Sequence, residues 1–187
     1  MMAALAQRRY IEAIPETLLQ EPLTFIFADH YRQRVVCTLL EELADADRLD
    51  VAKTEEIVDY LTTDMMVHVA DEEEDLFPLL RRRCAPEDEI EAVLAKLTAE
   101  HTVDGRTGRD VVDGLRGLIA TRAPPRADPD IRAKLIAFVR SQRRHLIAEN
   151  NIVLPIARAR LIDTDLANLS KRMAARRGID LDGTKND

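Results

Sequence analysis

The sequence contains no tryptophan, and aromatic residues make up only 4% of its 187 residues. Glycine is also scarce, whereas 46% of the chain is hydrophobic and 33% is charged. A chain rich in Ala, Leu, Glu and Arg but poor in aromatic residues and glycine is typical of an all-α protein. The length suits one domain, with or without a tail.

Cysteine is nearly absent too, because the chain has only Cys37 and Cys84, and their spacing matches neither a redox nor a zinc motif. We expect Cys37, which lies on an apolar stripe, to be a core residue. No segment approaches the roughly 18 apolar residues of a membrane span, and the first residues lack a signal-peptide pattern. We therefore expect a soluble, cytoplasmic protein. Its net charge of −7 argues against non-specific nucleic-acid binding, so we expect neither nucleic acid nor membrane as a partner.

Four long segments carry apolar residues at helical spacing, and short polar or proline-containing stretches separate them. Long amphipathic helices with short connections predict an up-down-up-down four-helix bundle. The oligomeric state is left open. The predicted helices cover residues 22–45, 51–83, 87–121 and 130–161.

The rest of the chain flanks this predicted bundle. We expect the bundle to span residues 22–162, with an N-terminal arm or short helix over residues 1–21. A short extra C-terminal helix and a tail should occupy residues 163–187. The basic side chains of that helix are expected to form a solvated face.

Two parts of the sequence resemble each other. His68–Leu80 reads HVADEEEDLFPLL and His145–Ala157 reads HLIAENNIVLPIA, each with a Glu four residues and a Pro ten residues after the His. One predicted helix earlier, each has an acidic residue followed by a lone His. The pattern indicates a duplicated helical hairpin and predicts two equivalent half-sites. Because Pro78 and Pro155 lack an N–H, we expect a kink or a wide turn just past each His–Glu pair.

All four histidines of the chain fall on the apolar stripes, together with two glutamates. The His-x-x-x-Glu spacing places both side chains on one face of a helix. An unpaired carboxylate inside a bundle costs several kcal/mol, so two buried glutamates require cations. The candidate metal ligands are His30, His68, Glu72, His101, His145 and Glu149.

This set of side chains suits two metal ions. Four imidazoles would give each ion two nitrogens, and both glutamates would bridge. An oxo or hydroxo bridge would then bring each ion to about five ligands, with one position open for a small molecule. Mixed imidazole and carboxylate ligation suits iron, with zinc or manganese as substitutes. No separate catalytic acid or base stands out, so we assign no catalytic residue and favour a binding protein over an enzyme.

Three further polar residues, Asp104, Gln142 and Glu73, are candidates for an extra ligand or for a hydrogen bond to an imidazole. An exposed position, or one facing an arginine, is an equal alternative for Asp104. Glu73 otherwise belongs with Glu74 and Asp75 on a predicted solvated face.

Two acidic residues directly precede a histidine, Asp29 before His30 and Glu100 before His101. Neighbouring helical residues point in different directions. We therefore expect Asp29 and Glu100 to have surface roles.

The order of the six candidate ligands resembles the hemerythrin-like, HHE cation-binding domain, as do the phrases HVADEEEDLFPLL, AENNIVLPIA and SKRMAARRG. The resemblance covers about residues 22–178. It implies a non-haem di-iron centre inside a four-helix bundle, with Glu72 and Glu149 as bridging carboxylates. It also implies binding of oxygen or a related small ligand.

The chain departs from the oxygen-carrying hemerythrins at two points. Those proteins have an extra His in a His-x-x-x-His pair on the third helix, whereas Leu97 and Gly105 flank His101 at that spacing. Their second carboxylate is an Asp five residues after the last His, where this chain has Glu149 four residues after it. The missing fifth imidazole argues against stable, reversible oxygen carriage. We expect a protein that binds or senses oxygen, nitric oxide or peroxide, or that handles iron. The alternatives are a redox enzyme that removes peroxide or nitric oxide, and a metal-stabilised partner-binding domain.

Overall fold

A computed structural model describes residues 10–181, and within this range the chain forms helices and connecting segments without any strand. The predicted all-α class is therefore confirmed. None of the helices in the described range combines the length and the apolar character that a membrane span needs. The α-helices are α1 (Pro22–Ala44), α2 (Val51–Thr62), α3 (Asp64–Asp71), α4 (Phe77–Arg83), α5 (Ile90–Thr121), α6 (Pro129–Ala148), α7 (Leu154–Arg160) and α8 (Asp163–Arg176).

Five shorter helical turns connect or precede these helices. Three are 3-10 turns and two, η2 and η5, are π-helical turns within otherwise continuous rods. The 3-10 turns are η1 (Glu16–Gln20), η3 (Pro86–Asp88) and η4 (Pro125–Ala127), and the π-helical turns are η2 (Glu72–Leu76) and η5 (Glu149–Val153).

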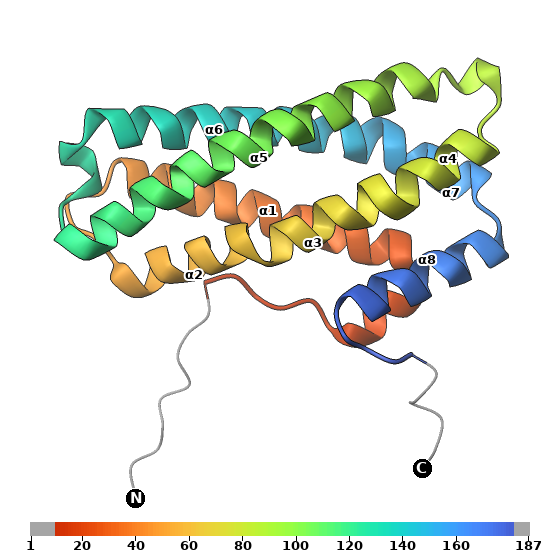
Figure 1. Ribbon diagram of the computed structural model, residues 1–187, viewed down its shortest axis with the longest axis horizontal. Coiled ribbons are helices and arrows are strands. Elements are labelled where there is room, and N and C mark those ends of the chain that lie inside the picture. Colours follow the sequence, from red (N-terminus) through yellow and green to blue (C-terminus); the bar gives the residue numbers. More distant parts are fainter. Residues whose placement is uncertain (1–9, 182–187) are drawn as a thin grey trace, which may run out of the picture.

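The long helices form a bundle. In Figure 1, α2, α3 and α4 follow one another as one rod of the bundle and α6 and α7 as another, and α1 and α5 each form a rod beside them. Helix α6 contacts both α1 and α5, and α2 contacts α5. The finer up-down-up-down order stays a prediction, as do the domain boundaries.

Residues 10–21 contain η1 and attach to α2 through the backbone N–H groups of Tyr10 and Ile11, which donate to Glu56. Residues 1–9 and 182–187 lie outside the described range.

Local sequence signals account for where several helices begin. Pro22 and Pro129 occupy the first turns of α1 and α6, where a missing N–H leaves no bond unmade. The side chain of Asp50 accepts a hydrogen bond from the backbone N–H of Lys53, and so caps α2. Asp128 caps α6 in the same way.

The predicted continuous helix over residues 51–83 is wrong in one respect, because it is interrupted at Thr63 between α2 and α3. The hydroxyls of Thr62 and Thr63 donate to the carbonyls of Val58 and Asp59, at 2.8 and 2.7 Å. Hydroxyl bonds to carbonyls four residues earlier bend helices. Two adjacent threonines therefore give a physical reason for the break.

The wide turns expected near Pro78 and Pro155 are confirmed as the π turns η2 and η5. The N–H of Phe77 bonds the carbonyl of Glu72, and the N–H of Leu154 bonds the carbonyl of Glu149, each five residues back. A proline on the next residue has no N–H and clashes with the carbonyl four residues earlier, so the wider turn relieves the mismatch. Both π turns consequently begin at a candidate ligand.

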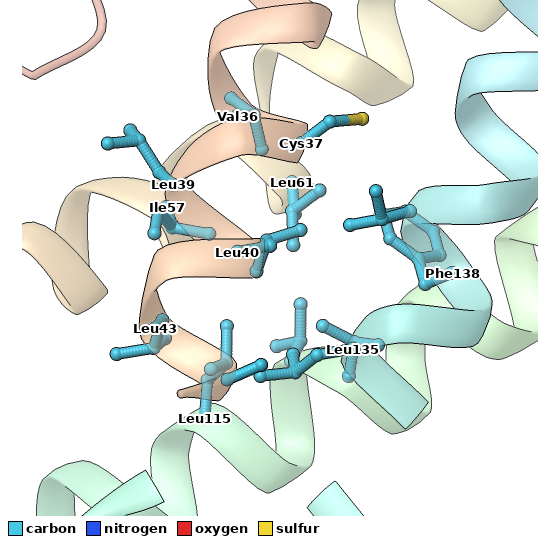
Figure 2. Packing of buried hydrophobic residues seen from close by; sticks show 14 of the residues in the cluster. Val36, Cys37, Leu39, Leu40, Leu43, Ile57, Leu61, Leu115, Leu135 and Phe138 are labelled. Atoms are coloured by element: carbon cyan, nitrogen blue, oxygen red, sulfur yellow. The ribbon is translucent and has the colours of Figure 1, made fainter. Parts of the chain in front are cut away.

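Two hydrophobic clusters fill the bundle on either side of a polar layer. Figure 2 shows part of the first cluster, in which side chains of α1, α2, α5 and α6 meet around Leu40, Leu115 and Leu135. Cys37 belongs to it, which confirms the prediction of a core cysteine. The second cluster, around Leu76, lies further along the same rods. On each rod the candidate metal ligands fall between the two clusters.

Helix α8 packs on the outside of the bundle, where its basic residues meet acidic residues of α3 and η2. Arg176 and Arg177 both donate to Asp71, and Arg176 also donates to Asp75 at 2.9 Å. The prediction of a solvated face is wrong for Arg176, Arg177 and Asp75, since α8 folds back onto this acidic turn. Lys171 and Arg172 are exposed, as predicted, but Arg172 also forms an ion pair with Asp75.

Candidate metal centre

Every rod of the bundle contributes a histidine to the polar layer. His30 comes from α1, His68 from α3, His101 from α5 and His145 from α6. The two glutamates come from the first positions of the π turns. Glu72 is 1% exposed and Glu149 is fully buried. The structure therefore brings together, inside the bundle, all six residues singled out as candidate ligands.

The first half of the centre joins the two histidines of the first hairpin to both glutamates. The Nε2 atom of His30 lies 3.5 Å from Oε1 of Glu72 and 3.4 Å from Oε2 of Glu149. The Nε2 atom of His68 lies 3.5 Å from Oε2 of Glu72. One ligand atom from each of the four residues falls within 4.8 Å of the others, a spacing that suits a single metal ion.

The second half uses the same glutamates with the histidines of the second hairpin. The Nε2 atom of His101 lies 3.4 Å from Oε2 of Glu72 and 3.9 Å from Oε1 of Glu149. The Nε2 atom of His145 lies 2.8 Å from Oε1 of Glu149. These four residues also form a group within 4.8 Å. The two groups share both carboxylates, which is the arrangement that two bridged metal ions need.

The inner polar atoms lack hydrogen-bond partners. Nε2 of His30 and all four carboxylate oxygens of Glu72 and Glu149 are buried without a hydrogen bond to any described residue. An uncompensated buried carboxylate costs several kcal/mol. Two divalent cations would satisfy these atoms at once, so the donor set fits a metal pair. Neither group includes a cysteine, which distinguishes the donor set from the thiolate sites typical of structural zinc.

Without metal, the protein balances the charges of these glutamates by proton uptake on the neighbouring histidines. Burial lowers the pKa of His68, but the Glu72 carboxylate and Asp29 outweigh this and raise it to about 10. Burial likewise lowers the pKa of His145, and Glu149 raises it to about 9. Burial raises the pKa of Glu72, but the neighbouring imidazoles hold it well below its usual range. Metal ions bind neutral imidazole and would therefore displace protons.

In the two His-x-x-x-Glu pairs, a carboxylate orients each histidine by contacting its Nδ1 atom, on the side of the ring away from the glutamates. The Nδ1 atom of His68 lies 3.2 Å from Oδ2 of Asp29, and that of His145 lies 3.0 Å from Oε2 of Glu100. The predicted surface roles of Asp29 and Glu100 are wrong. Each points away from the histidine beside it in sequence, as expected, but towards the histidine on the next rod. Such acceptors fix the proton on Nδ1 and leave Nε2 free for a metal.

The two lone histidines are supported by the residue that follows each glutamate. Nδ1 of His30 lies 3.1 Å from Oδ1 of Asn150, whose amide nitrogen donates to a backbone carbonyl. Nδ1 of His101 lies 2.6 Å from Oε1 of Glu73. Glu73 thus takes one of the positions proposed for it, as an acceptor from an imidazole. The repetition of all four supporting contacts supports the duplicated arrangement of the half-sites.

The other two candidates lie beside the centre and pair with each other. Nε2 of Gln142 donates to Oδ2 of Asp104 at 2.8 Å, and the Ser141 hydroxyl donates to Oδ1 at 2.9 Å. Burial raises the pKa of Asp104. Neither residue belongs to the ligand groups found in the described range. The alternative that Asp104 is exposed or faces an arginine is wrong, because it is buried against α6.

Sequence reasoning missed Asn150 entirely and misplaced Asp29 and Glu100. A signal was present for all three. Asp29 and Glu100 occupy equivalent positions in the duplicated hairpins, and Asn150 occupies the position equivalent to Glu73. Paired polar residues at equivalent positions next to metal ligands are candidates for supporting contacts.

The comparisons with known proteins concern most of the chain. The family model for the hemerythrin HHE cation binding domain matches residues 21–157. This range includes all six candidate ligands and the residues that support them. No curated protein matches the chain.

Proposed function

This chain belongs to the hemerythrin HHE cation-binding domain family, and we propose that it holds a non-haem di-iron centre that binds or senses a small molecule such as oxygen, nitric oxide or peroxide. A role in iron handling would use the same residues. Zinc or manganese could replace iron, because imidazole and carboxylate ligands accept all three.

One observation carries this proposal. The Nε2 atoms of the four histidines face two buried glutamates whose oxygens lack hydrogen bonds to any described residue. In this proposal His30 and His68 hold one ion, and His101 and His145 hold the other. Glu72 and Glu149 bridge the two.

The other side chains keep the ligands in place. Asp29 and Glu100 accept the Nδ1 protons of His68 and His145, and Glu73 accepts that of His101. These contacts preset the imidazole tautomers and lower the cost of ordering the ligands when metal binds. Two iron ions bound there would supply one-electron redox chemistry and an open coordination position for a small molecule.

Iron loading of matched variants tests the site. The full chain is loaded with ferrous iron without oxygen, and iron per chain and the absorption spectrum are recorded before and after exposure to air. We expect two irons per chain and a new charge-transfer band in air. Glu149→Gln should lose iron, whereas Asp165→Asn should not. Asp165 is also a carboxylate in an ion pair, but it contacts Arg83 away from the site. Sub-stoichiometric iron, unchanged by His68→Ala or His145→Ala, would refute the proposal.

A redox enzyme that removes peroxide or nitric oxide is the second candidate. It is favoured by a cavity that reaches His68, His101 and His145, because a molecule in it would lie beside the ligand rings. Catalytic consumption of peroxide by the iron-loaded protein, lost in Glu72→Ala, would select the enzyme. Loss of helicity on chelation, without any reactivity towards these molecules, would select a metal-stabilised partner-binding domain.

A further inference from the structure

A cavity of about 400 Å³ lies beside the candidate metal centre. Its wall includes His68, His101 and His145, and its lining residues come from α1, α2, α3, α5 and α6. A water molecule occupies about 30 Å³ of liquid, and sites for small organic ligands measure about 300–1,000 Å³. The cavity is therefore larger than a diatomic molecule requires.

Two glycines of α5 help to keep this space open. Gly105 and Gly108 both line the cavity, three residues apart on one face of the helix. A Cβ atom added at Gly105 would meet nothing within 4 Å, and one at Gly108 would lie 3.5 Å from the Phe138 ring. Glycine costs a helix interior about 1 kcal/mol relative to alanine. No packing contact explains Gly105, which is consistent with a need for open space.

Gln33 of α1 provides a buried polar atom beside this cavity that has no partner. Its side chain lines the cavity and is 4% exposed, and its Nε2 atom makes no hydrogen bond to any described residue. A buried donor without a partner costs about 1–3 kcal/mol. The other amide in the wall, that of Gln142, already donates to Asp104. The terminal χ3 torsion of glutamine is broad, so rotation of the Gln33 amide turns this free donor towards a bound molecule.

The remaining wall is unsuited to a charged ligand. Leu61, Met65 and Val112 contribute apolar surface. Both carboxylate oxygens of Asp104 already accept hydrogen bonds from the protein. Arg109, Asp113 and Arg116 also line the cavity, but all three are exposed, so their charges lie in solvent. An ionised group placed against this part of the wall, away from the histidines, would be uncompensated, and such burial is costly.

We propose that this cavity binds a small uncharged organic molecule with an apolar body and one hydrogen-bond acceptor oxygen. The oxygen accepts from Nε2 of Gln33, and the body lies against Met65 and Val112 beside the histidine rings. The inference rests on the proposed function, to which it adds the class of organic ligand that lies next to the metal centre. Because protein side chains alone form the wall of the cavity, binding of this molecule does not require metal.

Calorimetric titration with two matched probes tests the proposal. Acetophenone carries a carbonyl acceptor on an apolar body, and isopropylbenzene has a similar shape without the oxygen. Each is titrated into the full chain, both as purified and after iron loading. We expect one acetophenone per chain in both forms, bound roughly threefold to tenfold more tightly than isopropylbenzene, as one net hydrogen bond implies. Gln33→Leu should abolish that preference while leaving the hydrocarbon affinity intact.

Two glycine variants separate the cavity from the rest of α5. Gly105→Leu places a side chain in the cavity and should abolish binding of both probes. Gly117→Leu is the matched control, because a Cβ at Gly117 also meets nothing within 4 Å but Gly117 does not line the cavity. Both variants replace a helical glycine and should raise helix stability.

Each outcome decides the proposal. Absence of acetophenone binding, or binding that survives Gly105→Leu, overturns it; the first result would mean that Gln33 bonds only water. An unchanged preference in Gln33→Leu overturns the assignment of the acceptor. Failure of the proposed function is distinguishable, because iron uptake would then fail while the titration of the metal-free chain is unaffected.

Discussion

The carboxylate of Asp29 offers the sharpest test of how the protein prepares its metal ligands. Asp29 is buried, accepts from Nδ1 of His68 and also binds Arg32 at 3.1 Å. Arg32 has a second acidic partner, Asp64, which is far more exposed and lies 3.2 Å away. Asp29→Asn removes the charge behind His68, whereas Asp64→Asn removes only a surface charge from the same arginine.

The expected effect follows from these contacts. An asparagine at position 29 carries no negative charge, so it cannot replace the carboxylate that accepts from both the His68 imidazole and the Arg32 guanidinium. The His68 ring is then held less firmly, and its Nε2 atom becomes less basic. Loss of such a supporting contact costs roughly tenfold to a hundredfold in metal affinity, or about 1.4–2.8 kcal/mol. Asp64→Asn should change metal affinity by less than about threefold, since exposed ion pairs contribute about 0–1 kcal/mol.

Competition with a chromophoric chelator, without oxygen, measures these affinities directly for ferrous iron. Circular dichroism of both variants checks that the helices are retained. Metal affinity of Asp29→Asn equal to that of the unmodified protein would refute the argument that Asp29 orients His68. An equal loss in Asp64→Asn would show that Arg32, not the carboxylate behind the imidazole, matters.

Three further predictions concern stability and reactivity. Arg176→Ala should lower the free energy of unfolding in urea by about 1.5–3 kcal/mol, because it removes charge-assisted hydrogen bonds to the buried carboxylates of Asp71 and Asp75. Arg126→Ala, which removes an ion pair between the exposed side chains of Arg126 and Asp47, should cost less than about 1 kcal/mol. Leu40→Ala should cost about 2–5 kcal/mol by the same assay without changing iron per chain, since Leu40 lies in the hydrophobic cluster away from the ligands. Iodoacetamide should label Cys84 before Cys37 in the native protein, as mass spectrometry of digests would reveal, because burial raises the pKa of the Cys37 thiol to about 11. Equal labelling rates would contradict the burial of Cys37.

The pattern along the chain was sufficient to predict the helices and the six residues at their centre. Apolar spacing marks the buried face of a helix regardless of what packs against it. The histidines and glutamates share those faces, so their convergence follows once the helices form a bundle. The duplicated phrases also locate both π turns, because the missing N–H of Pro78 and Pro155 is a local, covalent property.

The partners of each side chain needed the tertiary structure. Asp29 and Glu100 were assigned to the surface, since sequence shows only that they point away from the adjacent histidine. The packing of helices far apart in the chain decides which rod lies on that side. It also decides that this rod carries His68 or His145 at the matching height. The same holds for Arg176, which reaches Asp71 only because α8 folds back onto the bundle.

Local spacing thus determined that four histidines and two glutamates lie on buried helix faces, since periodicity and proline chemistry act within one helix. Only the tertiary structure decided that each Nε2 faces the glutamate pair while each Nδ1 meets an acceptor on another rod. It also decided that a cavity opens beside Gly105 and Gln33. These features depend on the heights and rotations at which whole rods pack, which no single segment of the sequence encodes.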